Sequence, residues 1–245
     1  MFAIRNRIRR LRAPHECNIC GWFGSTFGSD SWHPETICPA CRCQVRHRLL
    51  VHLLRNHPVN NFSNLLDGKR VLHFAPEPWF SKMLRGSTSE YTTADYLQEG
   101  CDLKLDMCAM PEIADHSLDT LIACDVLEHV PSESAALREI QRVLRPGGTA
   151  ILTVPEANGL DSKFELPIGA PPEEMLEKCG QIDHQRIYGR DDFGKILKDA
   201  GFLVEIRDHT NISEKAVQKL CLFPPVLSEH HLATNQRHIY FATNE

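Results

Sequence analysis

The stretch from residue 118 to residue 155 constrains the fold most, because the spacing of its apolar residues changes twice. Residues 118–124 are apolar beyond the second position, which predicts a buried strand. Ser132 is suited to cap a helix, and residues 146–148, Pro-Gly-Gly, are suited to end it. Between them apolar residues recur at helical spacing, namely Ala136, Ile140, Val143 and Leu144. Residues 149–154 predict a second strand, so the stretch forms one strand–helix–strand unit.

Such a unit predicts an α/β fold, because a crossover that holds a helix joins two parallel strands and covers one face of their sheet. We therefore expect a mainly parallel sheet with helices on both faces. Further strands are predicted at residues 69–74, 91–95, 103–106, 203–208 and 237–243, and a helix at residues 214–222.

The composition is that of a globular protein large enough for one α/β domain and a small extra module. The chain has 245 residues, of which 42% are hydrophobic and 24% charged. No apolar run approaches the roughly 18 residues that a membrane span needs. The basic N-terminus lacks the apolar segment of a signal peptide, so we expect a cytoplasmic protein. In that setting ten cysteines indicate thiols and metal rather than disulfides.

Charge is spread unevenly along the chain, which indicates two modules. Residues 1–60 hold nine Lys or Arg against three Asp or Glu, whereas the remainder holds eighteen against twenty-nine. Five arginines fall within the first twelve residues. We expect residues 1–14 to form a basic, solvated arm, with contact to phosphate or an acidic membrane surface as the alternative.

Four cysteines in residues 15–44 predict a zinc ribbon. Cys17, Cys20, Cys38 and Cys41 follow the spacing C-x2-C-x17-C-x2-C, which is typical of structural zinc sites. Each C-x2-C turn can direct two thiolates at one ion, and four protein ligands leave no open position for catalysis. Cys43 and His33 are competing ligands, and Cys43 is left out because it lies too far along for the usual turn.

Residues 45–64 are expected to form a connecting helix followed by a polar linker. Leucines at helical spacing predict the helix, while His47 and His52 lie off that apolar stripe and are expected to be solvated. The turn-rich segment at 56–64 marks the domain boundary. The main domain is therefore expected at residues 65–245.

The sequence of residues 118–155 resembles strand 4, helix 4 and strand 5 of class I S-adenosylmethionine (SAM) dependent methyltransferases, in particular the type 11 group with its "VLEHV…E..RVL.PGG" signature. The residues "VLHFAPE" at 71–77 resemble a subgroup that also carries a zinc ribbon. The resemblance implies a Rossmann-like sheet of seven strands whose last strand is antiparallel. It also implies SAM as a cosubstrate.

The resemblance places the cofactor loop after the first strand of the main domain, where this chain departs from the family. His73 takes the usual acidic position, and Ala75, Glu77 and Trp79 take positions that are normally glycine. The absence of a G-x-G-x-x-G pattern excludes a dinucleotide dehydrogenase. On the resemblance, Ala75, Pro76 and Glu77 line the methionine end of SAM, with Glu77 near its ammonium group.

Further cofactor residues follow the second, third and fourth strands. Asp95 lies twenty-two residues beyond His73, a spacing that suits a carboxylate on the ribose hydroxyls. Asp106 and Met107 resemble the adenine contact of the family. Cys124 and Asp125 end the next strand, at the edge where ligands bind in open α/β sheets, so that Asp125 would face the cofactor or the acceptor.

Two histidines are candidates for the general base. His129 follows the fourth strand, and its imidazole would be largely neutral at pH 7. Glu128 could join it in holding a divalent ion, but the sequence places no further ligand nearby, so no ion is expected there. His184 lies in the run "DHQRIY", which resembles a recurring methyltransferase segment. Residues 156–180 are rich in Gly and Pro and are expected to form an irregular lid that selects the acceptor.

These features predict a SAM-dependent methyltransferase that acts on an oxygen or nitrogen of a small molecule, with a sugar or a glycan as the expected acceptor class. An acidic main domain disfavours general nucleic-acid binding. The zinc ribbon and the basic arm leave an RNA or protein methyltransferase open as an alternative. A non-catalytic adaptor with the SAM fold is the other alternative, because the first loop lacks glycine. The sequence does not indicate an oligomeric state.

Overall fold

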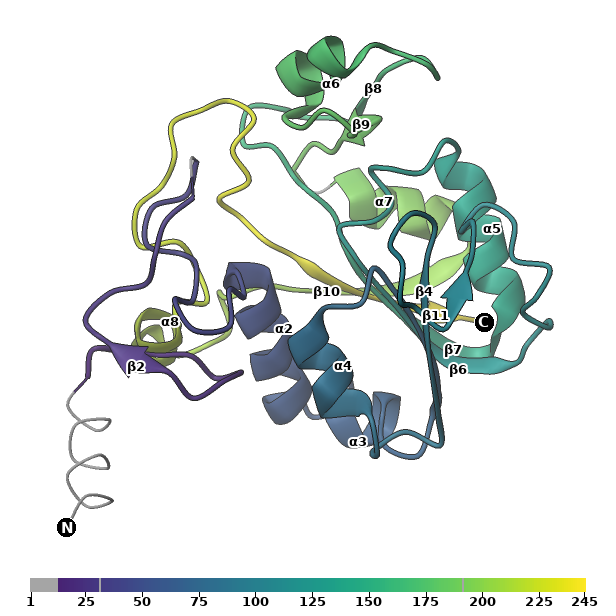
Figure 1. Cartoon of the computed structure of the whole chain (residues 1–245), viewed down its shortest axis with the longest axis horizontal. Coiled ribbons are helices and arrows are strands. Elements are labelled where there is room, and N and C mark those ends of the chain that lie inside the picture. The colour runs from purple at the N-terminus through teal and green to yellow at the C-terminus, as the bar shows by residue number, and fades with distance from the viewer. Residues whose placement is uncertain (1–12, 31, 191) are drawn as a thin grey trace.

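The structure is a computed structural model that describes residues 13–245 except residues 31 and 191. A seven-stranded sheet forms its centre (Figure 1). The strands are β3 (Arg70–Phe74), β4 (Glu90–Asp95), β5 (Leu103–Lys104), β6 (Leu118–Cys124), β7 (Leu144–Thr153), β10 (Phe202–Arg207) and β11 (Ile239–Asn244). Their order is β10-β11-β7-β6-β3-β4-β5. β11 is antiparallel to both neighbours and every other pair is parallel, which confirms the predicted Rossmann-like sheet.

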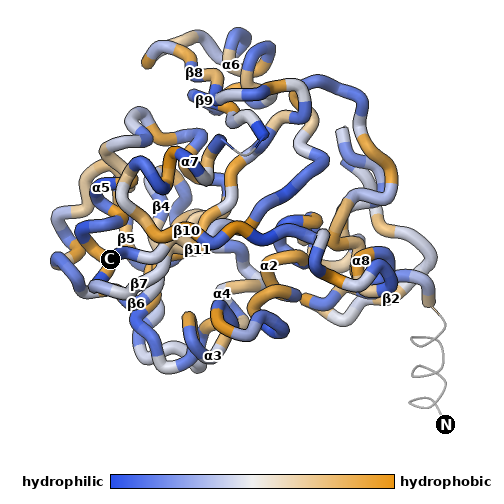
Figure 2. The backbone as a smooth tube through the Cα atoms, turned by 180° about the vertical axis from the view of Figure 1, so that it is seen from behind, coloured by the Kyte–Doolittle hydropathy of each residue, from blue (hydrophilic) through white to orange (hydrophobic). Residues whose placement is uncertain are grey.

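Helices cover both faces of the sheet because successive strand residues point to opposite sides. Leu121 and Leu152 pack against one pair of helices, α5 (Glu133–Val143) and α7 (Asp192–Asp199). Their neighbours Ile122 and Ile151 pack on the other side. The helices of that side are α2 (Val45–Asn56), α3 (Phe62–Leu65), α4 (Pro78–Leu84) and α8 (Glu214–Leu220). The hydrophobic segments converge accordingly on the central strands (Figure 2). Among the residues that the structure describes, no helix is long and apolar enough to cross a bilayer.

The central unit forms as the sequence predicts, except at one junction. The hydroxyl of Ser132 accepts a hydrogen bond from the backbone N–H of Ala135 at 3.3 Å and so caps α5. β7 begins at Leu144 rather than at residue 149, because Leu144 pairs directly with Leu118 and a register shift absorbs the turn residues. A Cβ at Gly148 would lie 2.9 Å from the carbonyl oxygen of Arg145, so this position requires glycine.

The N-terminal module and the main domain share packed surfaces. The short strands of the module, β1 (His15–Glu16) and β2 (Phe23–Gly24), pair antiparallel. The buried residues packed together with Phe27 include Cys221 from the main domain, and the others are Cys17, Cys38, Cys43 and Val45. Helix α2 follows the module and buries four leucines against the sheet, namely Leu49, Leu50, Leu53 and Leu54. Most of the predicted basic arm, residues 1–12, lies outside the described residues.

The lid region contains regular structure where an irregular segment was expected. A two-residue strand, β8 (Phe164–Glu165), pairs antiparallel with β9 (Arg186–Ile187), and helix α6 (Pro172–Cys179) lies between them. Prolines around residue 171 suggested a loop, but Pro172 occupies the first helical position, where its missing N–H is not needed. The lid forms a separate lobe beyond the end of the sheet (Figure 1).

One buried arginine joins the N-terminal module to the C-terminal half of the chain. The Arg48 side chain is fully buried in α2. Its guanidinium donates to the carbonyl oxygen of Thr36 at 2.7 Å and of Cys43 at 3.0 Å. It also donates to the carbonyl oxygens of Leu220 at 2.8 Å and Cys221 at 3.0 Å. Arg48 therefore satisfies carbonyl groups from three separate segments.

We expect Arg48→Met to lower the free energy of unfolding by about 3 kcal/mol, because it leaves several buried carbonyl groups without donors. Arg55→Met is the matched control, since Arg55 lies on the same helix and donates to one carbonyl, that of Asn18, at an exposed site. Its expected loss is below about 1 kcal/mol. Urea unfolding measures the free energy of unfolding of both variants. An equal loss of stability in the two variants would contradict the role given to Arg48.

Candidate active site

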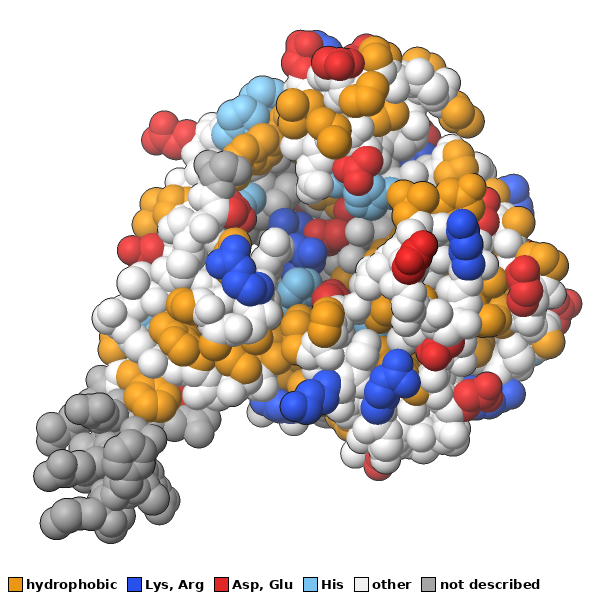
Figure 3. All heavy atoms as spheres, viewed as in Figure 1, with side chains coloured by type: hydrophobic (Ala, Val, Ile, Leu, Met, Phe, Trp, Pro, Cys, Tyr) orange, Lys and Arg blue, Asp and Glu red, His pale blue; other side chains and the backbone are white. Residues whose placement is uncertain are grey.

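Two cavities meet at the carboxyl ends of the central strands. The first, of about 450 Å³, lies over the ends of β3, β4 and β6. The second, of about 480 Å³, lies between the N-terminal module, the lid and the segment that precedes β11. Asp125 and His129 line both cavities. A hollow with Lys or Arg, Asp or Glu, and His side chains in its walls is visible on this face (Figure 3).

The first cavity is the candidate cofactor site, because it brings together most of the residues predicted for that role. Ala75, Asp95, Asp106, Met107 and Asp125 line it. Four predicted residues are not among its lining residues, namely His73, Pro76, Glu77 and Cys124. Val130 and Pro131 supply an apolar wall that was not predicted, since nothing in their sequence pattern marks a ligand contact.

The backbone at the floor of this cavity takes an unusual shape at two positions. Ala75 and Asp125 have φ angles of 47° and 53°, in the left-handed region that favours glycine. They follow β3 and β6, which pair directly with each other. The left-handed conformation costs an alanine roughly 1–2 kcal/mol. Ala75 therefore adopts a backbone conformation that glycine usually adopts, at a position where the resembling family normally has glycine.

The two predicted cofactor acids shape the loops in which they lie. Asp95 Oδ1 accepts hydrogen bonds from the backbone N–H groups of Leu97 and Gln98, each at 2.7 Å. Asp106 Oδ1 accepts from the N–H of Cys108 at 2.8 Å. Both side chains thus use one carboxylate oxygen to hold the rim of the cavity. Each carboxylate has a second oxygen that can accept from a ligand.

Glu77 is held by two buried histidines instead of lining the cavity. Its carboxylate contacts Nε2 of His47 and Nε2 of His73, each at 3.1 Å. Burial alone would raise the pKa of Glu77, but the contacts with these histidines lower it below its ordinary range. The expectation that His47 is solvated was wrong, because α2 turns His47 toward Glu77 and buries it. Helix α2 is thereby joined to the first loop of the main domain.

Asp125 is paired with two arginines that come from distant parts of the chain. Its Oδ2 lies 3.2 Å from Nε of Arg46 and 3.5 Å from Nη1 of Arg237, and its Oδ1 accepts from Thr153 Oγ1 at 2.7 Å. Burial alone would raise the pKa of Asp125, but the two guanidinium groups lower it. Both arginines line the second cavity. Neither arginine was predicted as a site residue, because Arg237 begins a predicted strand and Arg46 lies in a predicted helix, and no motif marks either position.

The two candidate bases lie beside each other in the second cavity. His129 and His184 have ring centroids 4.8 Å apart and nearly perpendicular planes. Burial and the neighbouring His129 lower the pKa of His184 to about 4. Glu128 is 1% exposed, and burial raises its pKa well above the ordinary value. The structure thus adds His184 to the Glu128–His129 pair, for which the sequence offered no further ligand.

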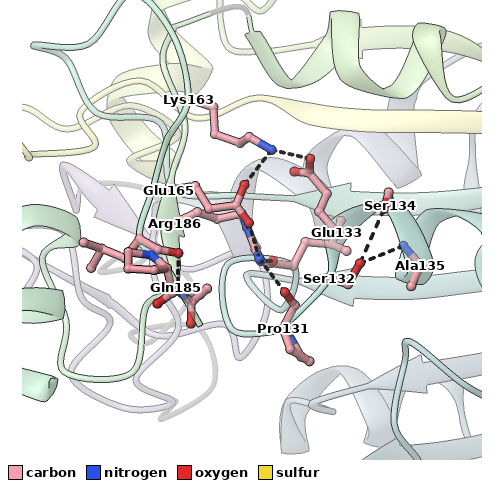
Figure 4. A network of polar contacts seen from close by, with 12 residues as sticks. Pro131, Ser132, Glu133, Ser134, Ala135, Lys163, Glu165, Gln185 and Arg186 are labelled. Carbon is pink, nitrogen blue, oxygen red and sulfur yellow. Dashed lines mark hydrogen bonds and ion pairs between the residues drawn. The ribbon is translucent and has the colours of Figure 1, made fainter. Parts of the chain in front are cut away.

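The lid is fixed over this site by a network around Arg186 (Figure 4). The fully buried Arg186 donates to Glu165 Oε1 at 2.9 Å and to the carbonyl oxygen of Leu127. Lys163 contacts Glu133 at 2.7 Å, which ties the lid to the start of α5. Tyr188 of the same predicted segment packs in the core of the main domain. The run "DHQRIY" therefore anchors the lid while it contributes His184 to the cavity.

The four predicted zinc cysteines form one cluster. The sulfur atoms of Cys17 and Cys41 lie 3.8 Å apart, and those of Cys20 and Cys38 lie 3.7 Å apart. Four sulfur atoms around a zinc ion at about 2.3 Å would be separated by about 3.8 Å, so the cluster fits a tetrahedral site. Cys43 lies 3.5 Å from Cys17 but outside the group of four. Such a closed site would stabilise the module and supply no chemistry.

Part of the chain is similar to known methyltransferases. Residues 68–152 match the family described as "Methyltransferase domain". The human thiol S-methyltransferase TMT1B is 35% identical over 92 residues, which cover 36% of this chain and 35% of that protein. The mouse protein of the same name matches equally. The match thus spans about a third of the length of these relatives.

Solved structures support the fold. One similar structure is an S-adenosylmethionine dependent methyltransferase from Mesorhizobium loti. The alignment covers 73% of this chain and 92% of that chain, with a TM-score of 0.50 and 14% identity. The YcgJ protein from Bacillus covers 81% of this chain and 99% of its own, with a TM-score of 0.50 and 13% identity. At this level of identity the likeness concerns the fold.

We expect Cys38→Ser to remove one equivalent of bound zinc per chain and to open the N-terminal module to proteolysis, because three thiolates do not complete the site. Cys43→Ser is the matched control, since Cys43 lies beside the cluster without belonging to it, and it should retain zinc. Elemental analysis after gel filtration measures the metal. Full zinc content in Cys38→Ser would contradict the assignment.

We expect Glu77→Gln to lower the free energy of unfolding by about 2 kcal/mol at pH 7, because His47 and His73 lose a charged partner. The pKa of Glu77 is lowered in the folded state, so its contribution is present above the unfolded carboxyl pKa of about 4.3 and is lost as the pH falls below it. The difference between the two proteins should therefore shrink below about pH 4.

Urea unfolding at a series of pH values measures this difference. Glu99→Gln, at an exposed position in the loop after β4, is the control and should have the same stability as the unchanged protein at every pH. A stability difference for Glu77→Gln that stays constant from pH 7 to pH 3 would show that the charge of Glu77 is unimportant.

Proposed function

We propose that this chain, which carries a methyltransferase domain with the class I fold, is a SAM-dependent methyltransferase that acts on a small polar molecule. The observation that carries the proposal is the meeting of two cavities at Asp125 and His129. A methyl donor in the first cavity and an acceptor in the second would approach each other at that shared wall. Methyl transfer needs chiefly such an alignment, because the sulfonium of SAM supplies an already activated methyl group.

Each cavity has residues suited to its ligand. The carboxylate of Asp95 can accept hydrogen bonds from both ribose hydroxyls, and the apolar side chain of Met107 can pack on the adenine ring. In the second cavity His129 is better placed than His184 to take a proton from the acceptor, because burial lowers the pKa of His184 to about 4. The charged wall formed by Arg46, Asp125 and Arg237 suits a polar acceptor.

The acceptor class is proposed on the same basis. A cavity of about 480 Å³ suits a small molecule or one sugar unit of a larger glycan better than a folded macromolecule. A hydroxyl or an amine is the nucleophile that the sequence analysis favours. A thiol is the competing class, because the curated relatives are named as thiol S-methyltransferases. A panel of sugars, amines and thiols with radiolabelled SAM distinguishes these acceptors.

We expect calorimetric titration of zinc-loaded protein to give saturable binding of SAM and S-adenosylhomocysteine, and Asp95→Ala to weaken both about 10- to 100-fold through loss of the ribose hydrogen bonds. Glu99→Ala, an exposed change four residues away, is the control and should bind as the unchanged protein does. Absence of binding by folded protein would overturn the enzyme and favour an adaptor. Binding that Asp95→Ala leaves intact would place the cofactor elsewhere.

A further inference from the structure

We propose that Glu128, His129 and His184 form a site for a divalent transition-metal ion at the wall of the acceptor cavity, separate from the four cysteines. One ligand atom from each of the three residues lies within 4.8 Å of the others. Glu128 Oε1 is 3.9 Å from Nε2 of His129 and 4.0 Å from Nε2 of His184. These distances are too long for hydrogen bonds. They suit three groups that face one ion, whose ligand atoms would be about 3.0–3.5 Å apart after a small inward shift.

The carboxylate of Glu128 is the first independent sign of a ligand. Its side chain is 1% exposed, and neither carboxylate oxygen has a hydrogen-bond partner. Buried polar groups are nearly always hydrogen-bonded, and a buried charge is nearly always paired or bound to a metal. A cation beside Glu128 would satisfy both oxygens at once. Without one, the carboxyl group is left unsatisfied inside a polar cavity.

The two imidazole rings are oriented as metal ligands usually are. Nδ1 of His129 lies 3.1 Å from the carbonyl oxygen of Asp183, and Nδ1 of His184 lies 3.2 Å from that of Cys179. A carbonyl oxygen only accepts, so each ring must carry its proton on Nδ1. The lone pair of each Nε2 then faces Glu128. Metal-binding histidines are commonly held by such hydrogen bonds from the other ring nitrogen.

Two imidazoles and one carboxylate indicate the class of ion and its chemistry. This ligand set suits Zn²⁺, Fe²⁺ and similar ions and leaves coordination positions open, unlike the four cysteines. Because all three residues line the acceptor cavity, an open position would face the acceptor. An ion there lowers the pKa of a bound hydroxyl or thiol. The ion would take over from His129 the task of activating the acceptor.

This role rests on the proposed function, and its chemistry balances. The acceptor X–H coordinated by the ion would release its proton to water. The X⁻ electron pair then forms the bond to the methyl carbon, while the carbon–sulfur bond of SAM breaks and its electron pair stays on sulfur. The products are the methylated acceptor, S-adenosylhomocysteine and one proton, with no oxidant or reductant required.

The test is titration of the whole 245-residue chain, its cysteine site already filled with zinc, with Co²⁺ as a spectroscopic probe. We expect one further equivalent to bind and to give the weak visible bands of a nitrogen and oxygen site, without new thiolate-to-cobalt charge-transfer absorption. Glu128→Gln and, separately, His184→Gln should weaken Co²⁺ binding at least tenfold. Glu173→Gln, an exposed acid of α6, is the control and should bind Co²⁺ as the unchanged protein does.

Circular dichroism and the SAM titration are recorded on the same samples, so that misfolding and failure of the proposed function are seen separately. If the variants lose their fold, His129→Gln is tested in their place. Binding of no further Co²⁺, or equal Co²⁺ binding by folded Glu128→Gln, would overturn the site even where SAM still binds. Charge-transfer bands alone would mean that cobalt had entered the cysteines, and would overturn the site as well.

Discussion

The pairing of Asp125 with Arg46 and Arg237 is the interaction on which the site depends. It joins the end of a central strand to the first turn of α2 and to the segment before β11. All three charges are largely buried, and removal of one member of a buried pair leaves an uncompensated charge at a cost of about 3–5 kcal/mol. Packing of the first turn of α2 and closure of the second cavity therefore depend on the same buried charge cluster.

The two cavities differ in how the chain builds them. The walls of the cofactor cavity come almost entirely from residues 74–131, which follow successive strands of the sheet. The second cavity is assembled from residues 30, 32–33, 44 and 46, the loop after β6, the lid and residues 232–237. The first cavity is thus built by the sheet and its loops, whereas the second is built by segments that are distant in the sequence. The N-terminal module thus contributes directly to the second cavity through Asp30, His33 and Gln44.

Local patterns predicted the fold and long-range contacts escaped prediction. The apolar period of residues 118–155 and the cap at Ser132 are local signals, and the structure confirms both. Asp95 was predicted from its distance along the chain from the first strand, and it lines the first cavity. Arg46 and Arg237 meet only after folding across 190 positions, so no local pattern marks them. The left-handed backbone at Ala75 was hidden for a different reason, since alanine rarely adopts it.

The distance in sequence between the walls of the acceptor cavity has a consequence for how the protein folds. A contact between residues that are far apart along the chain closes a large loop. The entropy cost of closing that loop delays the formation of the contact. We expect the sheet and the loops of the first cavity to form first, and the second cavity to form only after β11 has inserted between β10 and β7. A nascent chain would thus complete the first cavity before the second.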